Sequence, residues 1–167
     1  MKRRRARLIL AFVLGLQACA ARQSSSAPAP TLDLTLGRAD GTTIEFAAIS
    51  GRPTLLFLFA TYDSASQFAL AQLLKFVEHE PDLQVIGIAL QPDAKAFLDL
   101  YKQSLSVPFA LYYDPGNRLL RGGTVLGRVR AVPMLVALDA DGGVRDQHFG
   151  VPSTDELRSL TDRALQR

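Results

Sequence analysis

The sequence predicts an α/β fold: a mixed central sheet flanked by helices, with a β-hairpin added at the N-terminus. The apolar run 54–60 is short and unbroken, as expected for a strand buried on both faces. Apolar residues then recur at helical spacing, at Leu70, Leu73, Leu74 and Val77. Farther on, 135–149 reads as strand, turn and strand, with Asp141-Gly142 in the turn.

The N-terminal hairpin is predicted from two short stretches. Residues 32–36 alternate leucine with polar residues, which favours a half-buried strand. Residues 37–41 form a turn, 42–46 a second strand, and 47–51 a one-turn connector. The central strand is then expected over 53–61.

The first long helix is predicted from about Ser64 to Glu80, because Pro81 ends it. Ser64 and Gln67 have capping-box spacing, with Asp63 as the alternative cap. A parallel strand is expected over 83–90, after the crossover.

The second helix is predicted to follow Pro92-Asp93. Its apolar face is expected to contain Ala94, Phe97, Leu98, Tyr101 and Leu105. A short strand at 109–112, a short helix at 117–121 and a final helix after Ser153 complete the order. The final helix is predicted to bury Leu157, Leu160 and Ala164.

Residues 1–19 have the pattern of a secretory leader, with a basic start and a nine-residue apolar stretch too short to span a bilayer. Leu16-Gln17-Ala18-Cys19 resembles a bacterial lipobox, which implies lipid attachment at Cys19. Ala20 then implies sorting to the periplasmic face of the outer membrane. The alternative is an ordinary signal peptide with Cys19 incidental. Residues 20–31 are predicted to be a flexible Ser/Ala/Pro tether.

The charge balance and the cysteine content limit the classes of function that the sequence supports. Five of the 19 basic residues lie in the leader, so the rest carries 14 basic and 16 acidic groups, a net of −2. This balance gives no argument for nucleic-acid binding. Cys19 is the only cysteine, so an intramolecular disulfide is impossible.

Residues 32–167 resemble a known protein family. Phe59-Ala60-Thr61-Tyr62 at the strand end, and Ala131-Val132-Pro133 some seventy residues later, resemble the TlpA-type thiol–disulfide oxidoreductases of the thioredoxin superfamily. The resemblance implies a thioredoxin-like fold, with a cis bond before Pro133. It also places the family's two cysteines at Asp63 and Ser66.

A carboxylate and a hydroxyl at these positions cannot carry out thiol chemistry, so no catalytic residue is expected. Asp63 and Ser66 are interpreted first as helix-start residues, with ligand contact as the alternative. Two interpretations of Pro133 are open. The family's peptide-binding groove is retained at this loop, or the proline is kept only because the sheet requires it. The expected binding residues are Tyr62, Asp63, Val132 and Pro133.

Two other groups of residues give weaker evidence of a functional site. Four arginines, at 118, 121, 128 and 130, indicate either a solvated surface or a site for an anionic partner or lipid headgroup. His79 and His148 are far apart in sequence, and the paired cysteines that copper-handling thioredoxin-like proteins use with a histidine are absent, so no metal site is expected. No cofactor is expected either.

Three functional hypotheses remain open. The first is a lipid-anchored, redox-inactive binding or scaffold module for an exported polypeptide or envelope protein. The second is a thiol–disulfide oxidoreductase or peroxiredoxin-like enzyme that uses Cys19 or thiols supplied by a partner. The third is a purely structural lipoprotein.

Overall fold

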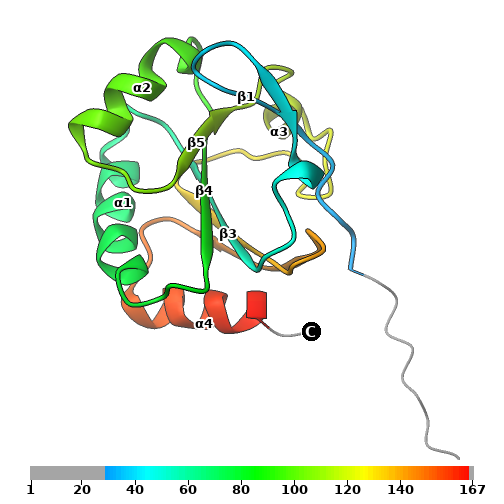
Figure 1. The fold of residues 1–167 in the computed structure, drawn as a ribbon, viewed down its shortest axis with the longest axis vertical. Coiled ribbons are helices and arrows are strands. Elements are labelled where there is room, and N and C mark those ends of the chain that lie inside the picture. Colours follow the sequence, from blue (N-terminus) through cyan, green and yellow to red (C-terminus); the bar gives the residue numbers. More distant parts are fainter. Residues whose placement is uncertain (1–28, 166–167) are drawn as a thin grey trace, which may run out of the picture.

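The computed structural model describes residues 29–165. The predicted leader, Cys19 and most of the tether lie outside the described residues. The described part forms one seven-stranded sheet with helices on both faces (Figure 1). The strands are β1 Thr35–Gly37, β2 Thr43–Glu45, β3 Thr54–Phe59, β4 Gln84–Ala89, β5 Ala110–Tyr113, β6 Met134–Leu138 and β7 Val144–Phe149. The helices are the 3-10 turn η1 Phe46–Ala48, α1 Ser64–Val77, α2 Ala94–Ser104, α3 Arg118–Arg121 and α4 Thr154–Leu165.

The strand order is β2-β1-β5-β4-β3-β6-β7. Strands β3, β4 and β5 run parallel, whereas β6 is antiparallel to β3 and β7 to β6. The hairpin β1–β2 joins the sheet through antiparallel pairing of β1 with β5. The predicted mixed sheet with an N-terminal hairpin is therefore confirmed.

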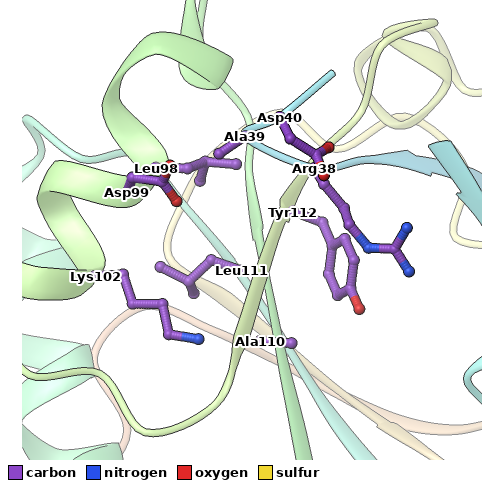
Figure 2. Close-up of a pocket in the computed structure, with 9 residues that line it drawn as sticks. All are labelled: Arg38, Ala39, Asp40, Leu98, Asp99, Lys102, Ala110, Leu111 and Tyr112. Atoms are coloured by element: carbon purple, nitrogen blue, oxygen red, sulfur yellow. The ribbon is translucent and has the colours of Figure 1, made fainter. Parts of the chain in front are cut away.

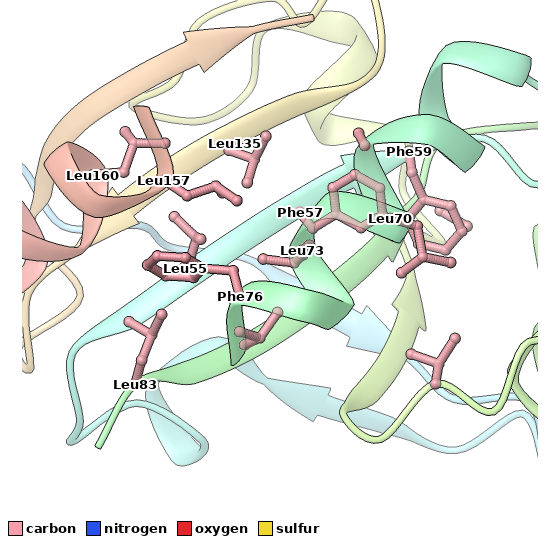
Figure 3. Close-up of a cluster of buried hydrophobic side chains, with 14 of the residues drawn as sticks. Leu55, Phe57, Phe59, Leu70, Leu73, Phe76, Leu83, Leu135, Leu157 and Leu160 are labelled. Carbon is pink, nitrogen blue, oxygen red and sulfur yellow. The ribbon is translucent and has the colours of Figure 1, made fainter. Parts of the chain in front are cut away.

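Strand β3 is central because every one of its residues is buried. Leu55, Phe57 and Phe59 face the layer formed by α1, α2 and α4, where leucines of α1 and α4 pack against them (Figure 3). The Phe57 and Phe59 rings stack at 5.0 Å, and Tyr101 of α2 stacks on Phe59 at 5.2 Å. This core fixes the end of β3 relative to α1 and α2.

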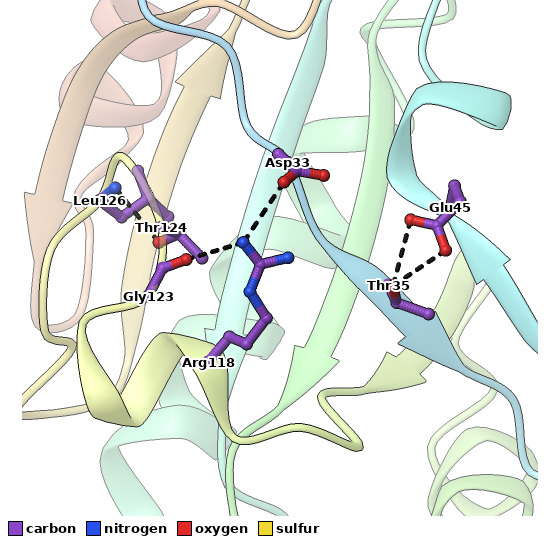
Figure 4. A network of polar contacts seen from close by, with 7 residues as sticks. All are labelled: Asp33, Thr35, Glu45, Arg118, Gly123, Thr124 and Leu126. Atoms are coloured by element: carbon purple, nitrogen blue, oxygen red, sulfur yellow. Dashed lines mark hydrogen bonds and ion pairs between the residues drawn. The ribbon is translucent and has the colours of Figure 1, made fainter.

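The opposite face of β3 is covered by the N-terminal segment and the short helix α3. Leu56 and Leu58 pack with the N-terminal residues Leu34 and Leu36 and with Leu119 of α3. An ion pair of 3.3 Å between Arg118 and Asp33 joins α3 to the N-terminal segment (Figure 4). The N-terminal chain and α3 therefore share one face of the sheet.

The first predicted strand is shorter than expected. Regular pairing begins only at Thr35, although Leu32 and Leu34 are buried as the alternation indicated. The reason is a different partner: the Leu32 N–H donates to the Gly142 carbonyl, and Thr31 bridges to Gly143. The chain thus pairs with the β6–β7 turn before it enters β1.

The helices also depart from expectation. Helix α1 ends at Val77 rather than near Glu80, because the chain tightens into turns before Pro81. In α2, Ala94, Leu98 and Tyr101 are buried, but Phe97 is 47% exposed and Leu105 is 37% exposed. Phe97 lies at the margin of the apolar stripe, and Leu105 follows the last helical residue. No helix within residues 29–165 has both the length and the apolar character needed to cross a bilayer.

Candidate functional site

The predicted site residues come from two turns at one edge of the sheet. Tyr62 and Asp63 follow the end of β3, whereas Val132 and Pro133 precede β6. Leu58 of β3 pairs with Met134 of β6, so the two turns leave the sheet side by side. The structure therefore brings the four predicted residues to a common edge.

The Val132–Pro133 peptide bond is cis. Pro133 is buried and Val132 is partly exposed. The Pro133 carbonyl accepts a hydrogen bond of 2.9 Å from the Gly150 N–H, which ties this loop to the end of β7. Neither the N–H nor the carbonyl of Val132 has a hydrogen-bond partner among residues 29–165. The loop thus presents unpaired backbone groups at the edge.

Asp63 is the N-cap of α1, and Ser66 is its main partner. The backbone N–H and the hydroxyl of Ser66 both donate to Asp63 Oδ2, each at 2.7 Å. Ser66 Oγ also accepts a hydrogen bond of 3.2 Å from the Ala60 N–H, and the residue is fully buried. An N-cap carboxylate satisfies the free N–H groups of the first turn. The two hydrogen bonds to Asp63 Oδ2 are those that the helix-start interpretation requires.

The expected capping box of Ser64 and Gln67 is wrong, and the alternative cap, Asp63, is used. Gln67 reaches back instead: its Nε2 donates to the Thr61 carbonyl at 2.8 Å. The Thr61 N–H donates to the side chain of Gln91. These two bonds hold the turn from both sides, so Tyr62 projects into solvent with 76% of its surface exposed.

An apolar pocket of about 300 Å³ opens beside this turn. It is lined by Thr61, Gln67, Phe97, Leu100, Tyr101, Ser104 and Leu105. Sequence reasoning missed it because Phe97 and Leu105 were assigned to the core. Leu100, 66% exposed and outside the predicted apolar face, was the available signal. A pocket with this lining can accept an apolar group.

Tyr101 forms part of the pocket wall. Its side chain is 8% exposed, and its hydroxyl has no hydrogen-bond partner among the described residues. Burial raises the pKa of Tyr101 to about 12, so the phenol stays protonated and remains a hydrogen-bond donor.

A second pocket of about 290 Å³ lies between the β1–β2 turn, α2 and β5 (Figure 2). Arg38 and Asp40 border it on one side, and Asp99 and Lys102 on the other. The Asp40 carboxylate accepts two hydrogen bonds from Thr42, which lower its pKa. It shares no residue with the edge that carries Tyr62 and Pro133. Its charges are of both signs, so it indicates no ligand class.

The two histidines do not lie at the edge that carries Tyr62 and Pro133. His79 is exposed on the turn after α1, and His148 lies in β7 with Nδ1 3.5 Å from Glu156. Within residues 29–165, no cluster of three or more His, Cys, Asp or Glu side chains is suited to a metal ion.

Comparison with known proteins establishes the fold. No family model and no curated protein sequence matches the chain. Solved structures do match, at identities that establish the fold alone. A protein from Aquifex aeolicus VF5 has a TM-score of 0.68 and 16% identity, over 82% of this chain and 94% of that one.

Two further similar structures are proteins named as thioredoxins or thiol:disulfide interchange proteins. A thiol:disulfide interchange protein of the thioredoxin family from Chlorobium tepidum TLS gives a TM-score of 0.63 and 16% identity, covering 86% of this chain and all of that one. Etrx1, an exposed lipoprotein thioredoxin of Streptococcus pneumoniae TIGR4, gives 0.61 and 21%, covering 78% and 98%. The chain is thus a thioredoxin-fold protein, as predicted. Its described residues contain no cysteine.

Proposed function

We propose that this chain is an exported, lipid-anchored thioredoxin-fold protein without thiol redox activity, and that it binds an extended segment of polypeptide. The binding edge consists of the turn at Tyr62 and Asp63 and the loop at Val132 and Pro133. The apolar pocket beside Tyr62 belongs to the same surface.

The observation that carries the proposal is the hydrogen bonding of Asp63 and Ser66. Thiol–disulfide exchange needs a thiolate that attacks a disulfide sulfur. At the two positions that correspond to the family's cysteines, this chain has a helix cap and a buried hydroxyl, already bonded to each other. Ser66 is fully buried, and its hydroxyl is engaged with Asp63 and with the Ala60 N–H, so it is closed off from a substrate. The edge therefore keeps its shape but has lost the electron-transferring atoms.

The groups that remain at the edge suit a peptide. The unpaired N–H and carbonyl of Val132 are free to bond to an extended chain, as an exposed strand edge does. Tyr62 offers an exposed aromatic ring, and aromatic residues are over-represented among the energetically dominant residues of interfaces. The pocket at Phe97 and Leu100 can receive an apolar side chain of the same peptide.

Export and anchoring rest on the leader and on the lipobox at Cys19. The structural match to an exposed lipoprotein thioredoxin of Streptococcus pneumoniae supports this assignment. Ala20 favours the outer membrane. The domain would then face the periplasm, where exported polypeptides pass.

The test is binding of a fluorescent, carboxymethylated and permanently unfolded protein, measured by anisotropy with the full chain in detergent. Tyr62→Ala and Leu100→Ala are each expected to weaken binding about fivefold or more, the usual effect of an interface anchor. Leu165→Ala is the matched control, because Leu165 is also exposed but lies beside Pro53, at the far end of β3. Equal affinity in all four proteins would favour the purely structural lipoprotein.

A further inference from the structure

The loop 121–131, here called the arginine loop, is held in a defined shape on the face shared with the N-terminal chain. The Gly123 N–H donates to the Arg118 carbonyl at 2.8 Å, and the Val129 N–H donates to the Leu119 carbonyl at 2.9 Å. Val129 is 4% exposed and packs in the core beneath α3. Arg128 and Arg130, on either side of it, are exposed.

The arginines of this loop are not neutralised by the domain. Arg121, Arg128 and Arg130 have no carboxylate within 4.0 Å among residues 29–165. Arg118, by contrast, pairs with Asp33 and also donates to the Gly123 carbonyl (Figure 4). The sequence contains no acidic residue from 115 to 138. The loop therefore presents three free positive charges.

The same loop carries apolar surface. A cavity of about 510 Å³ is lined by Leu120, Arg128, Val129 and Arg130. Val125, near the middle of the loop, is 44% exposed. Guanidinium groups beside an apolar wall match the two parts of a phospholipid, its phosphate and the start of its acyl chains.

The position of the predicted anchor points to the same partner. Nine residues lie between Cys19 and Ala29, and the ten steps along the chain span at most about 35 Å when fully extended. The described chain then passes through Leu32, Leu34 and Leu36 on the sheet face that also buries Leu119 and Val129. A lipid at Cys19 would keep this face within reach of the bilayer.

We propose that Arg121, Arg128 and Arg130 dock the domain on the anionic headgroups of the membrane that holds its lipid anchor. Docking leaves α1, on the opposite face of the sheet, directed away from the bilayer. The proposal rests on the anchoring part of the proposed function and is independent of peptide binding. Each arginine near an anionic surface strengthens attachment about fivefold, an effect that salt screens.

The test is depth-dependent fluorescence quenching. The full chain, expressed with its leader, is extracted and reconstituted into vesicles that contain nitroxide-labelled lipid. A thiol dye is attached at Val125→Cys in the arginine loop or at Gln72→Cys on α1, which is exposed on the far face. Vesicles are neutral phosphatidylcholine, with or without one third (~33%) phosphatidylglycerol as the anionic lipid.

The expected result is stronger quenching at position 125 than at 72 in anionic vesicles. The difference should be lost in neutral vesicles, in high salt, and in the triple variant Arg121→Gln, Arg128→Gln, Arg130→Gln. Equal quenching at both positions, or a difference that survives the triple substitution, would overturn the proposal. A chain that does not incorporate into vesicles would overturn the anchor and this docking together. The binding assay with the unfolded protein would still test peptide binding at the Tyr62–Pro133 edge separately.

Discussion

The hydroxyl of Ser66 donates a hydrogen bond of 2.7 Å to the carboxylate of Asp63. The two residues are the N-cap and the third residue of α1, and the sequence resemblance assigns the family's two cysteines to these positions. The helix start is thereby completed by polar contacts that carry no redox chemistry.

Removing the Ser66 hydroxyl should destabilise the domain. In Ser66→Ala the Ala60 N–H loses its acceptor inside the core, and a buried donor left without a partner costs about 1–3 kcal/mol. Urea unfolding of both proteins measures this loss. Ser64→Ala is the control, because Ser64 is exposed and has no side-chain hydrogen bond among those of residues 29–165. A loss in the control as large as in Ser66→Ala would contradict the explanation.

Placing cysteines at positions 63 and 66 should allow a disulfide to form. The variant Asp63→Cys, Ser66→Cys is made in a Cys19→Ser background, so that only the new thiols are present. Because Ser66 Oγ lies 2.7 Å from Asp63 Oδ2, cysteines at the two positions would lie next to each other, and mild oxidation should close the pair. Thiol titration before and after oxidation measures this. Two thiols that stay free would show that the edge does not have the geometry that a disulfide needs.

Removing the Tyr101 hydroxyl should not weaken the domain. The group is buried without a partner among residues 29–165, and Phe keeps the ring that stacks on Phe59. Tyr101→Phe is therefore expected to be neutral or to stabilise by about 1 kcal/mol, since an unpaired buried hydroxyl is costly. Tyr112→Phe is the matched control, a buried tyrosine in β5 for which no gain is expected. Destabilisation of Tyr101→Phe in urea would contradict this description of the pocket wall.

The start of α4 should make stability depend on pH. Hydrogen bonds from the backbone N–H and the hydroxyl of Ser153, each 2.7 Å, lower the pKa of Glu156, and the charge of His148 acts in the same direction. A folded-state pKa below the unfolded one stabilises the fold above the ordinary glutamate value of about 4.3, and this contribution is lost at lower pH.

Glu156→Gln should therefore be less stable than the parent chain at pH 6, and the gap should close as the pH falls below the ordinary glutamate value. Urea unfolding at pH 6, 5, 4 and 3 follows both proteins. A gap that stayed constant over this range would show that the carboxylate's ionisation does not contribute.

Much of the fold could be predicted because its strongest elements are local in sequence. Residues 55–59 are apolar at every position, and only a strand covered on both faces buries them all. The turn with Asp141-Gly142 identifies the β6–β7 hairpin in the same way. Such signals need no knowledge of distant contacts.

The parts that could not be predicted depend on distant partners. Pairing with the β6–β7 turn shortened the first strand, and nothing near residue 32 indicates that contact. The expected capping box is absent because Asp63 caps α1, so Ser64 is already helical and Gln67 bonds to the Thr61 carbonyl instead. The apolar pocket arises only where α2 meets the turn at Thr61, so Phe97 alone resembled a core residue.

The most direct test of the central claim is an insulin-reduction assay on the purified full chain with dithiothreitol as electron donor. We expect the wild-type rate to equal the rate of dithiothreitol alone. The Asp63→Cys, Ser66→Cys variant serves as the positive control and should exceed that rate. Thiol-dependent turnover by the wild-type chain would contradict the claim that this thioredoxin fold has exchanged redox chemistry for binding.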